Sequence, residues 1–219
     1  MNIDKLKDAQ RRFLAQYPGG FSNPQMLEIA KKHRAEKMRK LSQESFSADQ
    51  FDDPSGIVAS MAKIISQSSM ISVFEKPKFR DLAKMMSDGE KVHLAHGLKE
   101  FLHGNQEIGF TLMADLLGSY KLAKWPLLTI CSVYYRPNEE AFIKPTTVKS
   151  IIAYFELEGL RYSPKPNYDF YRAYREQLMR MKELVDISLQ ADNAAFSAFL
   201  MLTANGLNEI GCGEPDFFR

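Results

Sequence analysis

The chain has 219 residues, of which 45% are hydrophobic and 26% charged, and its formal net charge is +2. A chain of this size and composition buries a real core without disulfides or metals, and its composition is not that of a disordered protein. The close balance of 29 basic and 27 acidic residues excludes a strongly basic or acidic protein, so only the distribution of charge along the chain is informative.

Two cysteines, Cys131 and Cys212, lie far apart and form no CxxC pair. This count excludes a disulfide scaffold and a zinc-finger ligand set, so we expect reduced thiols. The first residues contain no apolar run typical of a signal peptide. The longest mostly apolar run, residues 194–204, is shorter than the roughly 20 residues that a membrane span needs. We therefore expect a cytoplasmic protein without a membrane partner.

Helical periodicity of apolar residues dominates the first 117 residues. A first helix is predicted over residues 3–16, before a Pro-Gly-Gly break. Ser22 or Asn23 then caps a second helix, which begins at Pro24 and runs to about residue 41. Further helices are predicted over residues 57–68, 77–86, 90–103 and 107–117.

The pattern changes at Trp125, the only tryptophan of the chain. Residues 127–135 are β-branched, aromatic and apolar and stand between two prolines, which predicts a strand. A turn and a short return strand over residues 141–144 complete a predicted β-hairpin. Helices follow over residues 145–155, 168–185 and 193–204.

Together these elements predict a mainly α, multi-helical globular protein with one small β-hairpin, at about residues 127–144. We expect a single helical domain over residues 1–219. Residues 1–45 form either part of its body or an N-terminal helical arm packed on the rest.

A first candidate site lies on the predicted second helix, whose residues 31–40 read KKHRAEKMRK. Six basic side chains are distributed around this helix, whereas a normal amphipathic helix keeps charge off one side. Contacts to phosphates require positive charge and little specific geometry, so this helix is a candidate for binding them. The alternative is a solvated helix whose long side chains cover apolar neighbours. The candidate anion-binding residues are Lys31, Lys32, Arg34, Lys37, Arg39 and Lys40.

A second candidate site lies at the junction before the helix at residues 145–155. Lys144, Thr146, Thr147 and Lys149 gather there, and backbone N–H groups at a helix start attract anions. The alternative is that one of the threonines simply caps the helix.

The long helix at residues 168–185 adds Arg172 and Arg175 as possible phosphate contacts. Acidic residues share its polar face, and they favour pairing between neighbouring turns on a solvated surface instead. Aromatic rings can stack on bases beside such cations. The candidate stacking residues are Tyr134, Tyr135 and Tyr162.

Four possible metal ligands share one face of the predicted helix at residues 90–103: His93, His96, Glu100 and His103. A single exposed helix face rarely closes a metal site, and the HExxH spacing is absent, so a polar solvent face is favoured and no metal is predicted. The sequence also contains no GxGxxG, P-loop or GxSxG motif, and no cofactor is predicted.

These observations favour a non-enzymatic binding module that contacts a polyanion, with nucleic acid as the leading candidate. One alternative is a protein–protein adaptor that uses the proline- and tyrosine-rich stretch at residues 124–178. Another is an enzyme acting on a small anionic substrate near Lys144–Thr147. Its general acid or base would be a histidine or one of Glu139, Glu140 and Glu156, and its pocket walls would be Trp125, Tyr135 and Phe142.

Overall fold

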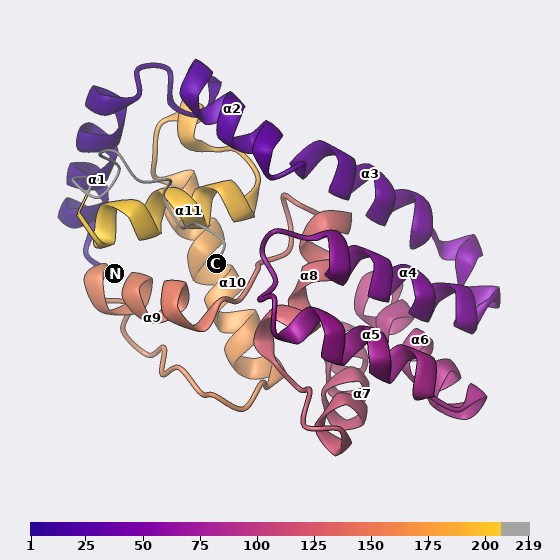
Figure 1. Ribbon diagram of the computed structural model, residues 1–219. Coiled ribbons are helices and arrows are strands. Elements are labelled where there is room, and N and C mark those ends of the chain that lie inside the picture. Colours follow the sequence, from indigo (N-terminus) through magenta and orange to yellow (C-terminus); the bar gives the residue numbers. More distant parts are fainter. Residues whose placement is uncertain (207–219) are drawn as a thin grey trace.

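The structure is a computed structural model, and it describes residues 1–206. These residues form eleven α-helices and three short 3-10 helices and contain no β-strand (Figure 1). The α-helices are α1 (Ile3–Gln16), α2 (Pro24–Lys32), α3 (Ala35–Ser45), α4 (Pro54–Gln67), α5 (Glu75–Met85), α6 (Asp88–His103), α7 (Gln106–Ser119), α8 (Trp125–Tyr135), α9 (Pro145–Tyr154), α10 (Tyr168–Glu183) and α11 (Asn193–Ala204). The 3-10 helices are η1 (Gly20–Ser22), η2 (Ala48–Asp52) and η3 (Ile187–Leu189).

Polar caps in the sequence explain where many of these helices begin. Ser87 and Glu90 form a capping box at the start of α6, in which the Glu90 carboxylate accepts a hydrogen bond of 2.8 Å from the Ser87 backbone N–H. Asn23 caps α2, and Pro24 stands in its first turn. The prediction of a mainly helical protein is confirmed.

The predicted β-hairpin at residues 127–144 is wrong, because Trp125–Tyr135 form helix α8. Nine of the eleven residues of α8 are buried. A helix buried on all sides has no polar face, so its sequence lacks helical periodicity and resembles a buried strand. Residues 141–144 are irregular, and side chains bind their backbone: Ile143 N–H donates to Thr129 Oγ1 at 3.1 Å.

The predicted second helix, at residues 24–41, is divided in two. Arg34 has left-handed backbone angles, with φ 52° and ψ 33°, so α2 ends at Lys32 and α3 begins at Ala35. No glycine or proline marks this position, and the break follows from tertiary packing. Helix α2 contacts η1, whereas α3 packs on α8 and α4.

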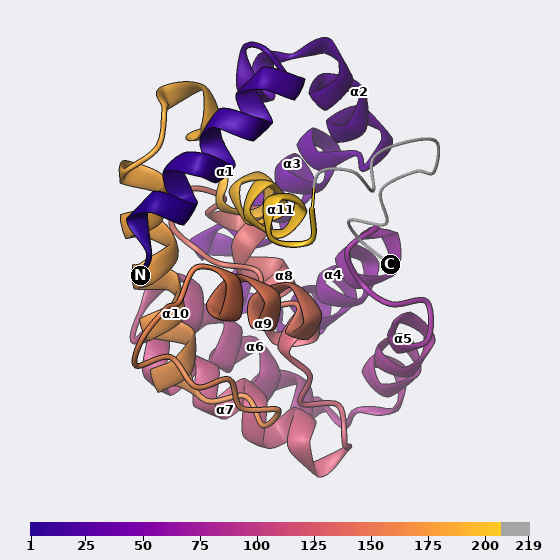
Figure 2. The same cartoon turned by 90° about the vertical axis from the view of Figure 1, so that its left-hand side faces the viewer.

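The helices form two groups that meet near α8 (Figures 1 and 2). Helices α3 to α7 lie on one side, and α1, α2, α9 and α11 lie on the other. Helices α6 and α7 pack as a close pair, because a Cβ atom at Gly109 would lie 2.2 Å from the Phe101 backbone nitrogen. No helix within residues 1–206 has the length and apolarity needed to cross a membrane.

Candidate functional site

A cavity of about 240 Å³ lies where the two groups of helices meet. Its walls come from α1, α2, α3, α8, α11 and the connector between α4 and α5. Most of the wall is apolar and includes Phe13, Met26, Ile29, Phe199 and Leu202. An apolar cavity of about 150 Å³ is known to hold a benzene molecule. This cavity therefore has room for a larger ligand.

Small side chains of α11 make this room. Ala194, Ala195 and Ala198 line the cavity, and so does Ala191, which lies just before the helix. The spacing of the three helical alanines places them on one face at the beginning of α11. The opposite side of α11 carries large buried residues such as Phe196, so the helix packs firmly while its alanine face leaves space.

Two polar pairs border the apolar wall. Arg39 Nη2 donates to Asp192 Oδ2 in an ion pair whose side chains are 29% and 15% exposed. Asp192 also caps α11, because its Oδ1 accepts from the Ala194 backbone N–H at 3.0 Å. His33 Nδ1 and Ser69 Oγ lie 3.0 Å apart. The Arg39–Asp192 charges compensate each other, so this border offers hydrogen bonds without a strong net charge.

Tyr134 of α8 completes the polar border. Its hydroxyl lies 2.9 Å from Ser68 Oγ, and Ser68 Oγ also accepts from the Met70 backbone N–H at 3.1 Å. Burial raises the pKa of Tyr134 to about 12, so the phenol is neutral near pH 7. This chain of bonds fixes the α4–α5 connector, residues 68–74, against α8.

A smaller hollow of about 20 Å³ adjoins the cavity and shares Met70, Ala194 and Ala198 with it. Lys144 and Thr147, two of the predicted anion-binding residues, line this hollow. The Thr147 hydroxyl lies in hydrogen-bond geometry with the sulfur of Met201, a weak acceptor, at 3.2 Å.

Neither predicted threonine caps α9, because no side-chain cap hydrogen bond is present at its start. Thr146 is exposed, and so is Lys149, whose Nζ lies 5.7 Å from the centre of the Tyr162 ring. The junction therefore divides: Lys144 and Thr147 line the hollow, whereas Thr146 and Lys149 are exposed.

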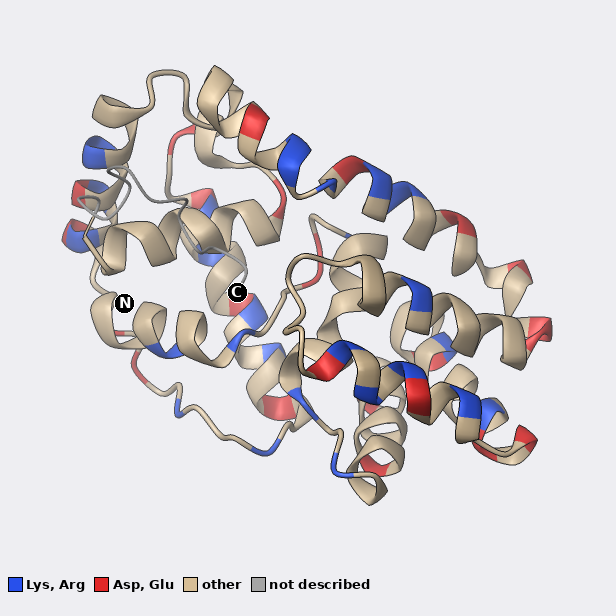
Figure 3. Cartoon of the chain, viewed as in Figure 1, with Lys and Arg blue, Asp and Glu red and all other residues tan. Residues whose placement is uncertain are grey.

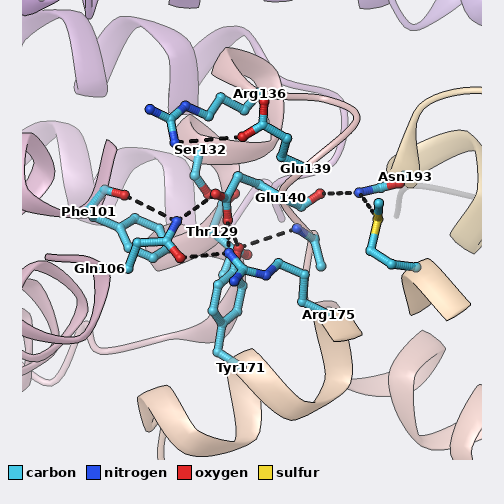
Figure 4. Close-up of polar contacts among 12 residues, drawn as sticks. Phe101, Gln106, Thr129, Ser132, Arg136, Glu139, Glu140, Tyr171, Arg175 and Asn193 are labelled. Atoms are coloured by element: carbon cyan, nitrogen blue, oxygen red, sulfur yellow. Dashed lines mark hydrogen bonds and ion pairs between the residues drawn. The ribbon is translucent and has the colours of Figure 1, made fainter. Parts of the chain in front are cut away.

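A buried polar network stands behind the start of α11 (Figure 4). Asn193 donates to the Glu140 carbonyl oxygen at 3.0 Å and accepts from Lys182 Nζ at 3.1 Å. The Asn193 backbone N–H donates to the carbonyl oxygen of Pro137, a residue of the cavity wall, at 2.8 Å. Burial lowers the pKa of Lys182. Asn193 therefore ties the cavity wall to α10.

The centre of this network is the buried carboxylate of Glu140 (Figure 4). It accepts hydrogen bonds from Gln106 at 2.7 Å, from Tyr171 at 2.5 Å and from Arg175 at 3.1 Å. Burial, together with the charge of Glu140, raises the pKa of Tyr171 well above its ordinary value. Burial alone would lower the pKa of Arg175, but the charge of Glu140 opposes this and the net shift is upward.

The cations predicted at residues 31–40 are largely paired. Lys31 pairs with Glu28 at 2.8 Å, and Lys40 lies 3.8 Å from Glu44. Arg39 belongs to the cavity border described above. Lys32 is exposed. Arg34 and Lys37 are exposed and form no ion pair with any residue in 1–206.

The structure does not bring Arg172 and Arg175 to this cluster, since α10 and α3 lie apart in both views (Figures 1 and 2). Arg172 stands between Asp169 at 3.9 Å and Glu176 at 3.8 Å, and Arg175 faces Glu140. Acidic residues therefore neutralise the charges of Arg172 and Arg175, as the acids on the polar face of this helix indicated for Arg172.

The three candidate stacking tyrosines differ in exposure. Tyr134 is buried at the cavity border. Tyr135 and Tyr162 are half-buried, and their rings pack edge-on against His103 and Phe170, with centroid distances of 5.3 and 5.8 Å.

The weak metal candidates are not assembled into a ligand set. His103 Nε2 lies 2.8 Å from the Phe46 carbonyl oxygen, and Glu100 accepts from the Asn105 backbone N–H at 2.9 Å. His93 and His96 are exposed. Within residues 1–206, no group of three His, Cys, Asp or Glu side chains is placed to hold a metal.

The residues expected to wall an enzyme pocket lie in different surroundings. Trp125 is in the core, where its Nε1–H donates to the Ser163 carbonyl oxygen at 2.8 Å, and Phe142 lines the small hollow. The two exposed carboxylates are in surface ion pairs, Glu139 with Arg136 and Glu156 with Lys5. Cys131 is buried in α8, whereas Cys212 lies outside the described residues.

The cavity escaped the sequence analysis because its wall is drawn from five helices and a connector. One signal was present: Ala194, Ala195 and Ala198 share one face of a helix that also carries the large apolar residues Phe196 and Leu200. No protein-family model matches the chain, and neither the curated proteins nor the solved structures include a significant match.

Proposed function

We propose that this chain is a binding protein for a small, mainly apolar molecule, which occupies the cavity between α1, α2, α3, α8 and α11. The observation that supports this most directly is the combination of a 240 Å³ apolar space with a few polar groups at its border. Ligand sites in proteins commonly have this composition, in which the apolar wall supplies affinity and the polar groups fix orientation.

The polar border favours a neutral polar group on the ligand. Arg39 and Asp192 already compensate each other's charge, so a ligand with a full charge would have to compete with this pair. His33 and Ser69 exchange a hydrogen bond that a hydroxyl or carbonyl group of a ligand can share. A hydrocarbon with one such group is the ligand class that we infer.

The volume sets the size of this ligand. If about 150 Å³ holds the six carbons of benzene, 240 Å³ holds about ten carbon atoms in proportion. At about 0.8 kcal/mol per buried methylene, ten carbons contribute about 8 kcal/mol, which corresponds to a Kd of about 1 μM. The costs of association make this the upper limit of affinity.

Calorimetric titration with linear alcohols of increasing chain length tests the proposal. We expect affinity to rise with length up to about ten carbons and then to level off as the cavity fills. Ala198→Leu places additional atoms in the cavity and should weaken binding of decanol at least about tenfold. Ala59→Leu, at an exposed position of α4, is the matched control. Equal affinities in both variants and the wild type would exclude this cavity as the site.

The alternatives from the sequence remain separate proposals. Polyanion binding by residues 31–40 depends mainly on Arg34 and Lys37, which are exposed and lack an ion pair within residues 1–206. An enzyme acting on a small anion would use the hollow beside Lys144 and Thr147. More of the structural observations support ligand binding in the cavity than support either of these two alternatives.

A further inference from the structure

The outer face of α5 exposes large apolar side chains. Val73 and Phe74, immediately before the helix, are 70% and 75% exposed, and Met85 at its last turn is 78% exposed. Phe74, Lys78 and Met85 fall on one stripe by their helical spacing, whereas Phe79 and Leu82 point into the core. Three such exposed side chains along α5 and the two residues before it are unusual for a surface that faces only water.

The same region concentrates unpaired positive charge. Within residues 1–206, Arg80 forms an ion pair only with its neighbour Asp81, at 3.3 Å between exposed side chains. Glu75 is the second acid of α5. Burial raises the pKa of its carboxyl group, and the positive charges of Lys124 and Lys78 nearby oppose this shift. Six further cations of this region form no ion pair with any residue in 1–206: Lys63, Lys76, Lys78, Lys84, Lys121 and Lys124.

These cations lie on neighbouring elements. Helix α4, which carries Lys63, packs against α5. Figure 3 shows basic positions along α5 and on the connector between α7 and α8 on the same side of the molecule. Helix α5 itself carries four cations and two acids, and Lys63, Lys121 and Lys124 add three cations from the neighbouring elements. The Glu90 carboxylate, which accepts from the Tyr120 hydroxyl beside Lys121, adds a third acid. The cluster predicted at residues 31–40 has no comparable excess of unpaired charge.

Lysines beside exposed apolar side chains match the surface of an anionic bilayer. Lysine side chains are attracted to anionic headgroups, and apolar side chains gain free energy when they enter the boundary between headgroups and acyl chains. Nucleic acid would attract the lysines but would leave Val73 and Met85 exposed to water, because its phosphates offer no apolar contact. The exposed apolar residues therefore favour an anionic bilayer over nucleic acid as the partner of this surface.

We propose that the α5 face, which comprises Val73, Phe74, Met85 and the surrounding lysines, docks on the surface of an anionic phospholipid bilayer. Val73 and Phe74 enter between the headgroups, and Lys78 and Lys84 lie over them. This docking is peripheral and needs no spanning helix, whereas the sequence argument against a membrane partner concerned spanning segments.

The docking face adjoins the cavity. Ser69 and Met70 line the cavity, and Val73 follows Met70 by three residues in the same connector. Three residues reach at most about 11 Å, so the inserted tip and the cavity wall are close together. If the proposed function holds, docking brings the cavity close to the lipid bilayer, in which an apolar ligand is concentrated. The docking itself does not depend on that function.

Co-sedimentation with vesicles tests the docking. We expect the full chain to bind vesicles of phosphatidylcholine with phosphatidylserine and to bind vesicles of phosphatidylcholine alone at least about tenfold more weakly. The double variant Val73→Ser/Phe74→Ser and the double variant Lys78→Glu/Lys84→Glu should each lose binding to the anionic vesicles about tenfold or more. Both change exposed side chains, and circular dichroism checks that the fold is retained.

Matched controls separate docking from general stickiness. Ile187→Ser removes an equally exposed apolar side chain on η3, and Lys37→Glu removes an exposed cation on α3, so both should bind as the wild type does. Equal loss in controls and test variants overturns the assignment. Absence of vesicle binding also overturns it, as does binding of a random-sequence oligonucleotide that is lost in Lys78→Glu/Lys84→Glu.

Failure of the two proposals can be told apart. Ala198→Leu should lose decanol binding and retain vesicle binding, because its side chain faces the cavity. Val73→Ser/Phe74→Ser should retain decanol affinity in solution and lose vesicle binding. If the cavity variant instead loses vesicle binding while the α5 variant retains it, the docking face is assigned wrongly.

Discussion

Glu140, in the connector between α8 and α9, faces Arg175 of α10 at 3.1 Å between Oε2 and Nη1 (Figure 4). The Glu140 side chain is 1% exposed and that of Arg175 is 20% exposed. With Gln106 and Tyr171 as further donors, this carboxylate joins α7, α10 and the connector. The pair belongs to the structure that holds the start of α11, and with it one wall of the cavity.

Removal of the guanidinium should destabilise the fold strongly. Arg175→Met leaves the Glu140 carboxylate buried without its counter-charge, and we expect a loss of about 3 kcal/mol in the free energy of unfolding. Arg172→Met on the same helix removes only exposed ion pairs and should change stability by less than about 0.5 kcal/mol. Urea denaturation measures both. Adding Glu140→Gln to Arg175→Met should recover part of the loss, and no recovery would contradict charge burial as its cause.

Two buried tyrosines of α10 should respond differently to loss of the hydroxyl. Tyr171→Phe removes a donor to Glu140 and an acceptor for the Ala141 backbone N–H, and we expect a loss of about 1–3 kcal/mol. The Tyr174 hydroxyl is buried and forms no hydrogen bond of good geometry within residues 1–206; the Ser197 hydroxyl nearby only weakly lowers its pKa against the effect of burial. Tyr174→Phe should therefore be close to neutral. Thermal unfolding of the two variants in parallel checks this. A larger loss for Tyr174→Phe would argue against the network.

The close contact between α6 and α7 requires a glycine. A Cβ atom at Gly109 would lie 2.2 Å from backbone nitrogen of Phe101, so Gly109→Ala forces the helices apart and should cost about 2–3 kcal/mol. Gly89, in the first turn of α6, has no atom within 4 Å of a built Cβ. Gly89→Ala should therefore leave stability unchanged or raise it by up to about 1 kcal/mol. Chemical denaturation of both variants distinguishes tight packing from helix propensity.

High pH should unfold the protein before its buried acids ionise. Burial raises the pKa of Cys131 and of Tyr134 to about 12, and raises those of Tyr171 and Tyr174 as well. In the unfolded chain these groups ionise near pH 9–10, so their contribution is complete below that range and is lost as pH rises towards 12. Each group removes about 1.4 kcal/mol per pH unit in this window. The exposed and half-buried tyrosines can ionise in the folded protein, but the buried ones should form tyrosinate only as helical circular dichroism is lost. Complete tyrosinate formation without loss of helix would contradict burial.

Polyanion binding by residues 31–40 makes a numerical prediction. If only Arg34 and Lys37 contact phosphates, the logarithm of duplex DNA affinity should fall against the logarithm of salt concentration with a slope of about −1.8. Six phosphate contacts would give about −5.4. Fluorescence anisotropy over a salt series measures the slope, and Arg34→Glu/Lys37→Glu should abolish binding while Lys40→Glu, which removes a paired cation, should not. No binding at low salt removes the hypothesis.

The sequence alone determined the helical class and most helix boundaries. Caps and apolar periodicity mark helices α1, α6 and α11, and both act within a few residues of the chain. Ser87 and Glu90 therefore set the start of α6, and Asp192 sets the start of α11, through contacts with neighbouring residues. It also indicated that acids on α10 would neutralise Arg172, because neighbours on a helix face are fixed by spacing.

Tertiary structure decided the rest. Helix α8 is buried on every side, which erases the polar face that would have identified it as a helix, and the break at Arg34 has no local signal. The partners of Glu140 and the wall of the cavity come from residues far apart in the chain. Burial and pairing arise only when helices pack, and they determine which cations remain available: those on α5 do, whereas most of those between Lys31 and Lys40 do not.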